Sequence, residues 1–308
     1  MTELLNSVLP GDEITDLTPL SGGASRQTWR FAAAGRPLVV QVRREGDMAA
    51  MNREVATLRA ARSAGALVAE VVACSADLAG TSEAFIVMAA IEGEAIARKI
   101  LRDDQYNAAR AVLVGQLGHS LGRLHSVPID HVPLLEEVDQ LDFYRTVFDS
   151  FGAPHPAFEL AFRWLQSKRP GATRRTVVHG DFRLGNLLVN GDGLAAVLDW
   201  ELAHLGDPVE DLGWLCVRAW RFGAKEHVAG LGNYGELLDA YEHACGVRVD
   251  VDAVHWWEVF GTLKWGIICM QQANAHLSGA IRSHELAAIG RRVCENEYDL
   301  FLALDGRW

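Results

Sequence analysis

The chain has 308 residues, of which 49% are hydrophobic and 22% are charged, and its formal net charge at pH 7 is −11. This composition is typical of globular proteins, and the length suits two domains or one large two-lobed unit. The acidic balance disfavours nucleic-acid and anionic-membrane partners, because both are negatively charged. It is compatible with a cationic substrate, although solubility alone also explains the sign.

The cysteines and the apolar segments indicate a cytoplasmic protein. The five cysteines form no CxxC pair and no zinc-type spacing. The first residues, MTELLNSVLPGDEITDL, lack the basic region and long apolar core of a signal peptide. The most apolar candidate for a membrane span, FGTLKWGIICM, is interrupted by Lys264. We therefore expect reduced, buried cysteines in a cytoplasmic protein.

The first third of the chain predicts a small sheet with one helix. Residues 27–32 (QTWRFA) and 37–42 (PLVVQV) have the pattern of strands separated by a turn. Residues 51–64 have apolar side chains at helical spacing. Residues 84–91 (AFIVMAAI) form a short apolar run that predicts a buried strand.

The rest of the chain predicts mostly helices. Residues 107–125 carry leucines at helical spacing, and residues 254–304 are rich in Trp and Leu. We expect an α+β fold with a β-rich N-terminal lobe at residues 1–90 and a larger helical lobe at residues 91–308. Ligand sites favour such a join between lobes.

A helix start is predicted at Asp207. In this interpretation Asp207 caps the helix, Pro208 takes the first helical position and Glu210 completes a capping box.

Polar residues surround a predicted hairpin in the middle of the chain. Residues 187–190 and 194–198 predict two strands joined by the turn sequence NGDG. Asn186 precedes the first strand and Asp199 follows the second, so the hairpin brings both residues to one end. Amide and carboxylate oxygens suit a Mg²⁺ ion that keeps several waters and binds phosphate oxygens.

Asp181 lies five residues before Asn186, beside the same end of the hairpin. A carboxylate there could accept a proton from an attacking hydroxyl or orient it. The pattern Asp-x-x-x-x-Asn, followed by a second metal-binding Asp, is the layout of a kinase catalytic loop and metal site. We therefore predict Asp181 as the catalytic base and Asn186 and Asp199 as Mg²⁺ ligands.

At these motifs the chain resembles a known family. VVHGDFRLGNLLV followed by AVLDWELAHLGDPVEDLGWL is similar to the aminoglycoside phosphotransferase family of small-molecule kinases. The similarity is greatest to the branch related to the kinase-like domain of acyl-CoA dehydrogenase family members 10 and 11. The resemblance covers most of the chain and implies a two-lobed protein-kinase-like fold that uses ATP and Mg²⁺. It also implies that His179 orders the catalytic loop and that Asp211 braces it.

The segment at residues 21–25 precedes the first of the predicted strands. A small loop of this kind could lie over nucleotide phosphates, with backbone N–H groups and hydroxyls as donors, although a Gly-Gly pair often marks only a turn. Its position ahead of the later motifs favours nucleotide binding by Ser21, Gly22, Gly23 and Ser25.

Glu54 resembles the Glu that pairs with a phosphate-binding cation from the sheet. The strand LVVQVRR leaves two candidates for that position, Gln41 and Arg43. We favour Arg43, because a charge is needed and a guanidinium matches phosphate oxygens. The spacing of eleven positions between Arg43 and Glu54 is shorter than the pattern predicts.

Residues 88–90 are predicted to link the lobes. In kinase-like folds this backbone meets the adenine edge, which implies nucleotide contacts from Met88 and Ala90. The alternative is an ordinary end of a buried strand.

Together these features predict an ATP- and Mg²⁺-dependent kinase that phosphorylates a hydroxyl of a small molecule. The branch resemblance implies a hydroxyacyl-CoA, and the family name implies an aminoglycoside. The alternative is a protein of a different class, a nucleotide-binding pseudokinase that acts as a binding or regulatory module without catalysis. A protein kinase is disfavoured, because the sequence contains no Asp-Phe-Gly and no Ala-Pro-Glu.

Overall fold

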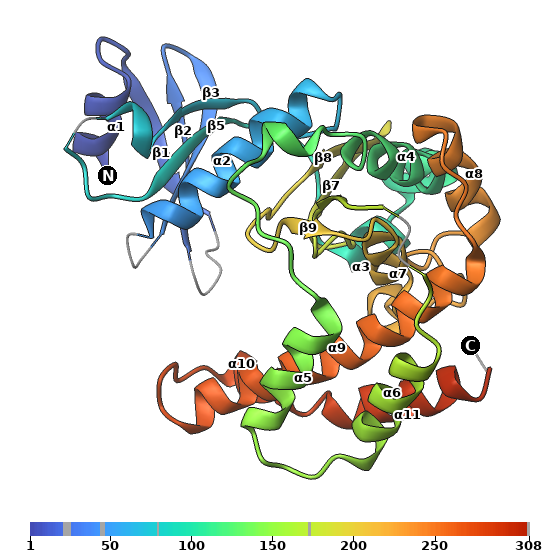
Figure 1. Ribbon diagram of the computed structural model, residues 1–308. Coiled ribbons are helices and arrows are strands. Elements are labelled where there is room, and N and C mark those ends of the chain that lie inside the picture. Colours follow the sequence, from blue (N-terminus) through green and yellow to red (C-terminus); the bar gives the residue numbers. More distant parts are fainter. Residues whose placement is uncertain (21–25, 44–46, 79, 172–173, 307–308) are drawn as a thin grey trace.

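The computed structural model describes residues 1–20, 26–43, 47–78, 80–171 and 174–306. Figure 1 shows a small lobe built on a sheet, and a larger lobe of helices that extends to the side of it and below it. The predicted α+β, two-lobed architecture is confirmed.

The small lobe contains a five-stranded antiparallel sheet. Side chains alternate across it, so Leu38 and Val40 face a core with helix α1, whereas Val39 and Gln41 line a cleft. In sheet order the strands are β1 (Ile14–Pro19), β2 (Arg26–Ala33), β3 (Arg36–Arg43), β5 (Phe85–Ala89) and β4 (Val71–Cys74), and α1 is Thr2–Val8.

Helix α2 (Met48–Ser63) covers the cleft side of this lobe and carries Glu54. It begins three residues before the predicted start, because the Asp47 side chain accepts a hydrogen bond from the Ala50 N–H and caps the helix there. Met51 and Leu58 are buried, and so is Glu54, which places a carboxylate inside the lobe.

The large lobe is organised around α9, a helix of 27 residues. Helices α7, α10 and α11 pack on α9, while α4 packs on α8. Gly118 and Gly122 allow that second contact, since a Cβ on Gly118 would lie 2.4 Å from the Leu237 carbonyl oxygen. The helices are α3 (Ala97–Arg102), α4 (Asn107–Leu124), α5 (Gln140–Ser150), α6 (Pro156–Ser167), α7 (Val209–Cys216), α8 (Tyr234–Cys245), α9 (Val251–Leu277), α10 (His284–Gly290) and α11 (Val293–Leu304). Within the described ranges, none of the helices is long and apolar enough to cross a membrane.

Two short two-stranded sheets flank the loop at residues 179–186, which contains Asp181. Strand β6 (Thr176–Val178) pairs with β9 (His204–Gly206), and β7 (Leu187–Asn190) pairs with β8 (Gly193–Val197). The predicted hairpin is therefore confirmed. The loop at residues 179–186 runs from β6 to β7, so its two ends are fixed by different sheets.

The start of α7 corrects one prediction. The Asp207 carboxylate accepts a hydrogen bond from the Val209 N–H at 2.9 Å, as a capping residue would, but Pro208 takes the cap position and Val209 begins the helix. The prediction that Glu210 completes a capping box is wrong. Its carboxylate is buried instead against His204 and Lys264, because it compensates a buried positive charge.

Candidate active site

A cavity of about 610 Å³ lies between the sheet of the small lobe and the β7–β8 hairpin. Both lobes contribute polar side chains to it. Those from the small lobe include Arg26, Gln41 and Glu54, and those from the large lobe include Asn186 and Asp199. The cleft therefore gathers polar and charged groups from β2, β3, α2 and the hairpin around one space.

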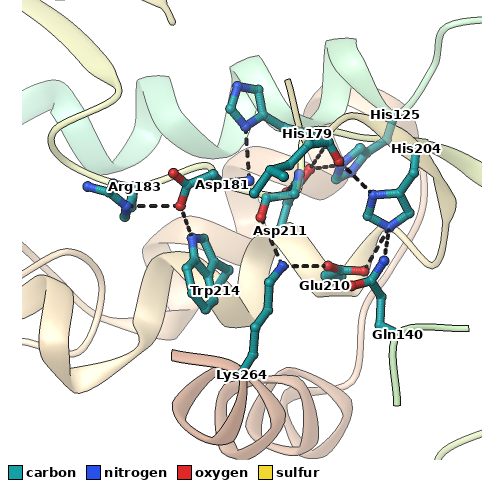
Figure 2. A network of polar contacts seen from close by, with 12 residues as sticks. His125, Gln140, His179, Asp181, Arg183, His204, Glu210, Asp211, Trp214 and Lys264 are labelled. Carbon is teal, nitrogen blue, oxygen red and sulfur yellow. Dashed lines mark hydrogen bonds and ion pairs between the residues drawn. The ribbon is translucent and has the colours of Figure 1, made fainter. Parts of the chain in front are cut away.

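The loop at residues 179–186 is anchored from below by a buried carboxylate. Asp211 of α7 accepts hydrogen bonds from the backbone N–H groups of His179 at 2.7 Å and Gly180 at 2.9 Å, and it contacts His125 Nε2 at 3.1 Å. Burial alone would raise the pKa of Asp211, but the hydrogen bond and charge of His125 hold it below its ordinary value. The expected bracing role of Asp211 agrees with this geometry (Figure 2).

Asp181 stands at the tip of this loop, with both carboxylate oxygens in hydrogen bonds. Oδ1 accepts from Arg183 Nε at 2.9 Å and from Trp214 Nε1 at 2.8 Å, and Oδ2 accepts from Asn186 Nδ2 at 2.5 Å. The side chain is 15% exposed. These donors hold the carboxylate in one orientation, which suits a group that orients a hydroxyl and receives its proton. Of the donors, sequence reasoning did not identify Trp214.

His179 supports the loop and is not available as a base. Its Nε2 contacts the Leu198 carbonyl oxygen at 2.9 Å, and its Nδ1 accepts a hydrogen bond from the Asp181 N–H at 3.1 Å. These partners assign the proton to Nε2. Burial lowers the pKa of His179, so the ring stays neutral. The expected ordering role agrees with these contacts.

Asn186 and Asp199 meet at one end of the hairpin, as the sequence predicts. The Leu198 N–H donates to the Asn186 carbonyl oxygen at 2.7 Å, and both Asn186 and Asp199 line the cleft. Asp199 has a φ of 60°, a left-handed conformation that is uncommon outside glycine. A strained backbone of this kind is frequent at functional sites.

The Asp199 carboxylate has the properties of a ligand for a cation. Partial burial, together with the charge of Glu201, raises its pKa to about 6. Among the described residues, no three His, Cys, Asp or Glu side chains could hold a metal ion by themselves. Mg²⁺ is often held by one or two protein oxygens, with waters and phosphate oxygens completing its shell. Asn186 and Asp199 therefore fit a Mg²⁺ that binds together with a nucleotide.

Arg26, on β2, is the cation at the centre of the cleft, and sequence reasoning missed it. Its guanidinium contacts Glu54 Oε1 at 2.7 Å, Gln41 Oε1 at 3.0 Å and Glu201 Oε2 at 3.0 Å, and it lies 3.6 Å from Asp199 Oδ1. Burial opposes its charge, but these carboxylates raise its pKa above the ordinary value. Its buried Nε has no hydrogen-bond partner among the residues that the structure describes.

The two residues that the sequence offered for this role lie beside Arg26. Gln41 points into the cleft, and Arg43 contacts Glu54 Oε2 at 3.5 Å, a longer contact than that of Arg26. The signal that could have found Arg26 is strand alternation: Thr28 pairs with Gln41 and Arg26 pairs with Arg43, so they share the cleft face. The phosphate-binding role of Arg43 stays a prediction.

The predicted adenine contact lies at the other end of the cleft. Met88 and Ala90 line the cavity, together with Ala89. The Ala90 N–H already donates to the Pro37 carbonyl oxygen at 3.1 Å, and the Ala89 N–H donates to Glu70. The adenine contact therefore stays a prediction. The residues predicted to cover the phosphates lie outside the described residues: Ser21, Gly22, Gly23 and Ser25.

A small sheet-bearing lobe, a helical lobe and a charged cleft with an Asp–Asn–Asp set define a kinase-like phosphotransferase. Residues 16–246, more than half of the chain, match the sequence model of the phosphotransferase enzyme family, APH. The chain belongs to this family.

Two curated relatives are acyl-CoA dehydrogenase family proteins. Member 10 of Mus musculus is 28% identical over 216 residues, which are 66% of this chain and 20% of that protein. Member 11 of Gallus gallus is 24% identical over 312 residues, which are 91% of this chain and 40% of that protein. The chain thus spans less than half the length of these relatives.

Solved structures share the fold across nearly the whole chain. A Ralstonia eutropha protein described as a candidate aminoglycoside phosphotransferase aligns with a TM-score of 0.77 at 20% identity, covering 99% of this chain and 97% of its own. Spectinomycin phosphotransferase APH(9)-Ia, solved with ADP and spectinomycin, aligns with a TM-score of 0.68 at 15% identity. The alignment covers 98% of this chain and 96% of that protein's chain. These likenesses confirm the predicted kinase-like fold.

Proposed function

We propose that the chain is an ATP- and Mg²⁺-dependent kinase that transfers the γ-phosphoryl group to a hydroxyl of a small metabolite. The observation that carries this proposal is the Asp181 carboxylate, held by Arg183, Trp214 and Asn186 beside a cleft that both lobes line. A binding module without catalysis has no need for a carboxylate oriented in this way.

Asp181 acts on the acceptor hydroxyl. The hydroxyl oxygen forms the new bond to the γ-phosphorus, the bond from that phosphorus to the oxygen bridging to the β-phosphate breaks, and the hydroxyl proton passes to an Asp181 oxygen. Phosphoryl transfer needs mainly positioning and charge neutralisation from the protein. The donors on Asp181 supply the positioning, since they fix both oxygens.

Asn186 and Asp199 would hold Mg²⁺, which would neutralise charge on the nucleotide phosphates. The raised pKa of Asp199 supports this role, because a nearby cation relieves the repulsion between Asp199 and Glu201. Asp199 also lies 3.6 Å from the Arg26 guanidinium, so a nucleotide phosphate at this place would lie near both residues.

Arg26 is the phosphate-binding cation in this proposal. It takes the place that the sequence assigned to Arg43, because it makes the shorter contact with Glu54 and lies nearest the hairpin carboxylates. Guanidinium groups bind phosphate oxygens with two parallel hydrogen bonds. The related folds that were solved with ADP or GDP are consistent with a nucleotide in the cleft.

For the acceptor, we rank a hydroxyacyl-CoA or a related hydroxy-metabolite above an aminoglycoside. The relatives named for acyl-CoA dehydrogenases support the first class. The solved complexes with spectinomycin and hygromycin B support the second. Arg218 and Arg221 are not a ready CoA-binding patch, because Arg221 is buried against Glu258 and Arg218 contacts Asp299.

The test is a mass-spectrometric screen for phosphorylated products. Protein and MgATP are incubated with hydroxyacyl-CoAs, amino alcohols, other hydroxylated metabolites and aminoglycosides, beside the variants Asp181→Asn and, as a matched control, Asp192→Asn in the exposed hairpin turn. We expect Asp181→Asn to lower kcat by about 10²- to 10⁴-fold with nucleotide binding intact, because a positioned base is lost. Asp192→Asn keeps the wild-type rate.

Three outcomes contradict parts of this proposal. Wild-type turnover by Asp181→Asn removes Asp181 from the mechanism. Aminoglycoside products without hydroxyacyl-CoA products reverse the acceptor ranking. Tight MgATP binding without any product across the panel favours a pseudokinase.

A further inference from the structure

A lysine is buried beneath the catalytic loop in the middle of α9. Lys264 is 2% exposed, and its Nζ donates to the Gly180 carbonyl oxygen at 3.0 Å and to Glu210 Oε1 at 3.2 Å. The ammonium lies 4.7 Å from the ring centre of Trp214 (Figure 2). It lies 5.7 Å from the ring centre of Tyr144. A fully buried ammonium is rare and requires charged and polar partners.

The charge on Lys264 is compensated away from the loop. Glu210, which pairs with Lys264, also contacts His204: Glu210 Oε2 lies 3.1 Å from His204 Nε2. The other ring nitrogen of His204, Nδ1, contacts the Leu202 carbonyl oxygen at 2.9 Å. Stability alone does not explain this arrangement, because well-packed apolar residues stabilise such an interior equally well or better than a buried ion pair. The contact with Gly180 is the feature that apolar residues could not reproduce.

Gly180 is held on both of its backbone polar groups. The Asp211 carboxylate accepts its N–H at 2.9 Å, and the Lys264 ammonium donates to its carbonyl oxygen at 3.0 Å. Gly180 has a φ of 80°, and a Cβ there would lie 2.6 Å from the Leu202 carbonyl oxygen, so this position requires glycine. Because Gly180 has so much conformational freedom, its orientation depends on these two partners.

The lysine also reaches Asp181 by a second route. Trp214, whose indole faces the Lys264 ammonium, donates from Nε1 to Asp181 Oδ1 at 2.8 Å. The same ammonium therefore fixes the peptide before Asp181 and the ring that orients its carboxylate. In Figure 2, Asp181 and Trp214 lie on one side of the Lys264 ammonium and Glu210 lies on the other.

We propose that Lys264 is a positioning residue for phosphoryl transfer, which sets the place of Asp181 through Gly180 and Trp214. The effect on kcat rests on the proposed function, whereas the effect on the loop does not. A shift of about 1 Å in a reacting group can lower a rate by about 10²-fold, so this anchor is expected to matter for turnover.

A merely structural role for the ion pair makes a different prediction. Lys264→Met keeps the length of the side chain but leaves the buried Glu210 carboxylate with His204 as its remaining partner, which lowers stability in either case. The double variant Lys264→Met/Glu210→Gln removes the carboxylate charge that has lost its ammonium partner. If the pair only joins α9 to α7, the double variant recovers both stability and kcat. If Lys264 positions Asp181, it recovers stability but not kcat.

The experiment compares the wild type, both single variants and the double variant by thermal unfolding, by kcat and KM for ATP, and by hydrogen exchange of the segment 177–184. For the double variant we expect near-wild-type unfolding, unchanged KM for ATP and a kcat about 10²-fold below wild type. We also expect faster exchange of the Gly180 and Asp181 amides. Glu210→Gln, in which Lys264 still reaches Gly180, keeps a higher kcat than the double variant.

Recovery of both kcat and slow exchange in the double variant overturns the proposal. Hydrogen exchange needs no acceptor or turnover, so it tests the anchor even if the wild-type chain transfers no phosphoryl group. In that case the proposed function fails, while faster exchange in the double variant still supports the anchoring of Gly180 and unchanged exchange refutes it.

Discussion

Charged side chains cluster in two places, the cleft and the loop support, by which we mean Asp211, Glu210, Lys264 and His204 beneath the catalytic loop. The two clusters differ in how completely hydrogen bonds and opposite charges compensate their buried groups. In the cleft, the buried Nε of Arg26 has no hydrogen-bond partner within the described ranges, and the pKa of Asp199 is raised to about 6. Beneath the loop, Asp211 and Glu210 have their pKa values lowered by hydrogen bonds and opposite charges that outweigh the effect of burial.

This difference distinguishes a surface suited to binding a ligand from a support whose charges are already compensated by protein groups. A nucleotide with Mg²⁺ would complete the cleft cluster, because a phosphate oxygen would accept a hydrogen bond from the Arg26 Nε–H and the metal would place positive charge beside Asp199 and Glu201. The loop support gains nothing directly from such a ligand. Substitutions in the two clusters are therefore expected to change stability in opposite directions.

The largest expected effect contrasts Asp211→Asn with Asp199→Asn. Asp211→Asn lowers the free energy of unfolding by about 3 kcal/mol, because two backbone N–H groups and His125 lose a charged acceptor inside the protein. Asp199→Asn raises it by less than about 1 kcal/mol after solvent screening, since a carboxylate with a raised pKa opposes folding at pH 7. Urea unfolding without Mg²⁺ measures both, and equal losses would erase the distinction between the clusters.

The next effect tests which arginine serves the cleft. We expect Arg26→Met to weaken ATP binding by about 10- to 100-fold with little change for adenosine, because charged hydrogen bonds to phosphate are lost. Arg43→Met is the matched control on the neighbouring strand and loses less. Isothermal titration calorimetry measures the Kd of each variant for ATP and for adenosine relative to wild type. A larger loss of ATP affinity in Arg43→Met than in Arg26→Met would assign the phosphate-binding role to Arg43.

The smallest effect is a pH dependence within the loop support. Burial lowers the pKa of His204, but Glu210 outweighs it and raises that pKa above its ordinary value. His204 therefore contributes stability below a pH of about 6.5, and this contribution is lost as the pH rises through the folded-state pKa. We expect the stability difference between wild type and Glu210→Gln to shrink by on the order of 1 kcal/mol over that range. Urea unfolding at several pH values checks it, and a constant difference would contradict the shift.

The sequence predicts those parts of the molecule that depend on short-range pattern. The strands, the hairpin and the convergence of Asn186 and Asp199 follow from alternation and turn residues, and the structure contains them. The capping of α2 by Asp47 extends that helix beyond its apolar pattern, which explains the error at its start.

The partners of the buried and cleft charges could not be predicted in the same way. Lys264 contacts Gly180 across 84 positions and Arg26 contacts Glu201 across 175, so neither pairing leaves a local pattern. Glu210 shows the consequence, since its spacing fits a capping box but a distant lysine determines its position. Trp214 likewise has the sequence pattern of a core residue, and only the tertiary structure brings its Nε1 to Asp181.

Helix α9 contacts both the catalytic loop, through Lys264, and the outer helices α10 and α11 of the large lobe. Its 27 residues span about 40 Å, with α10 and α11 packed along it and Lys264 between its ends. One inserted residue before Lys264 would rotate the ammonium by about 100° around the axis and away from Gly180. We therefore expect an insertion in the first half of α9 to disturb the contact between Lys264 and Gly180, which depends on the number of residues in that half.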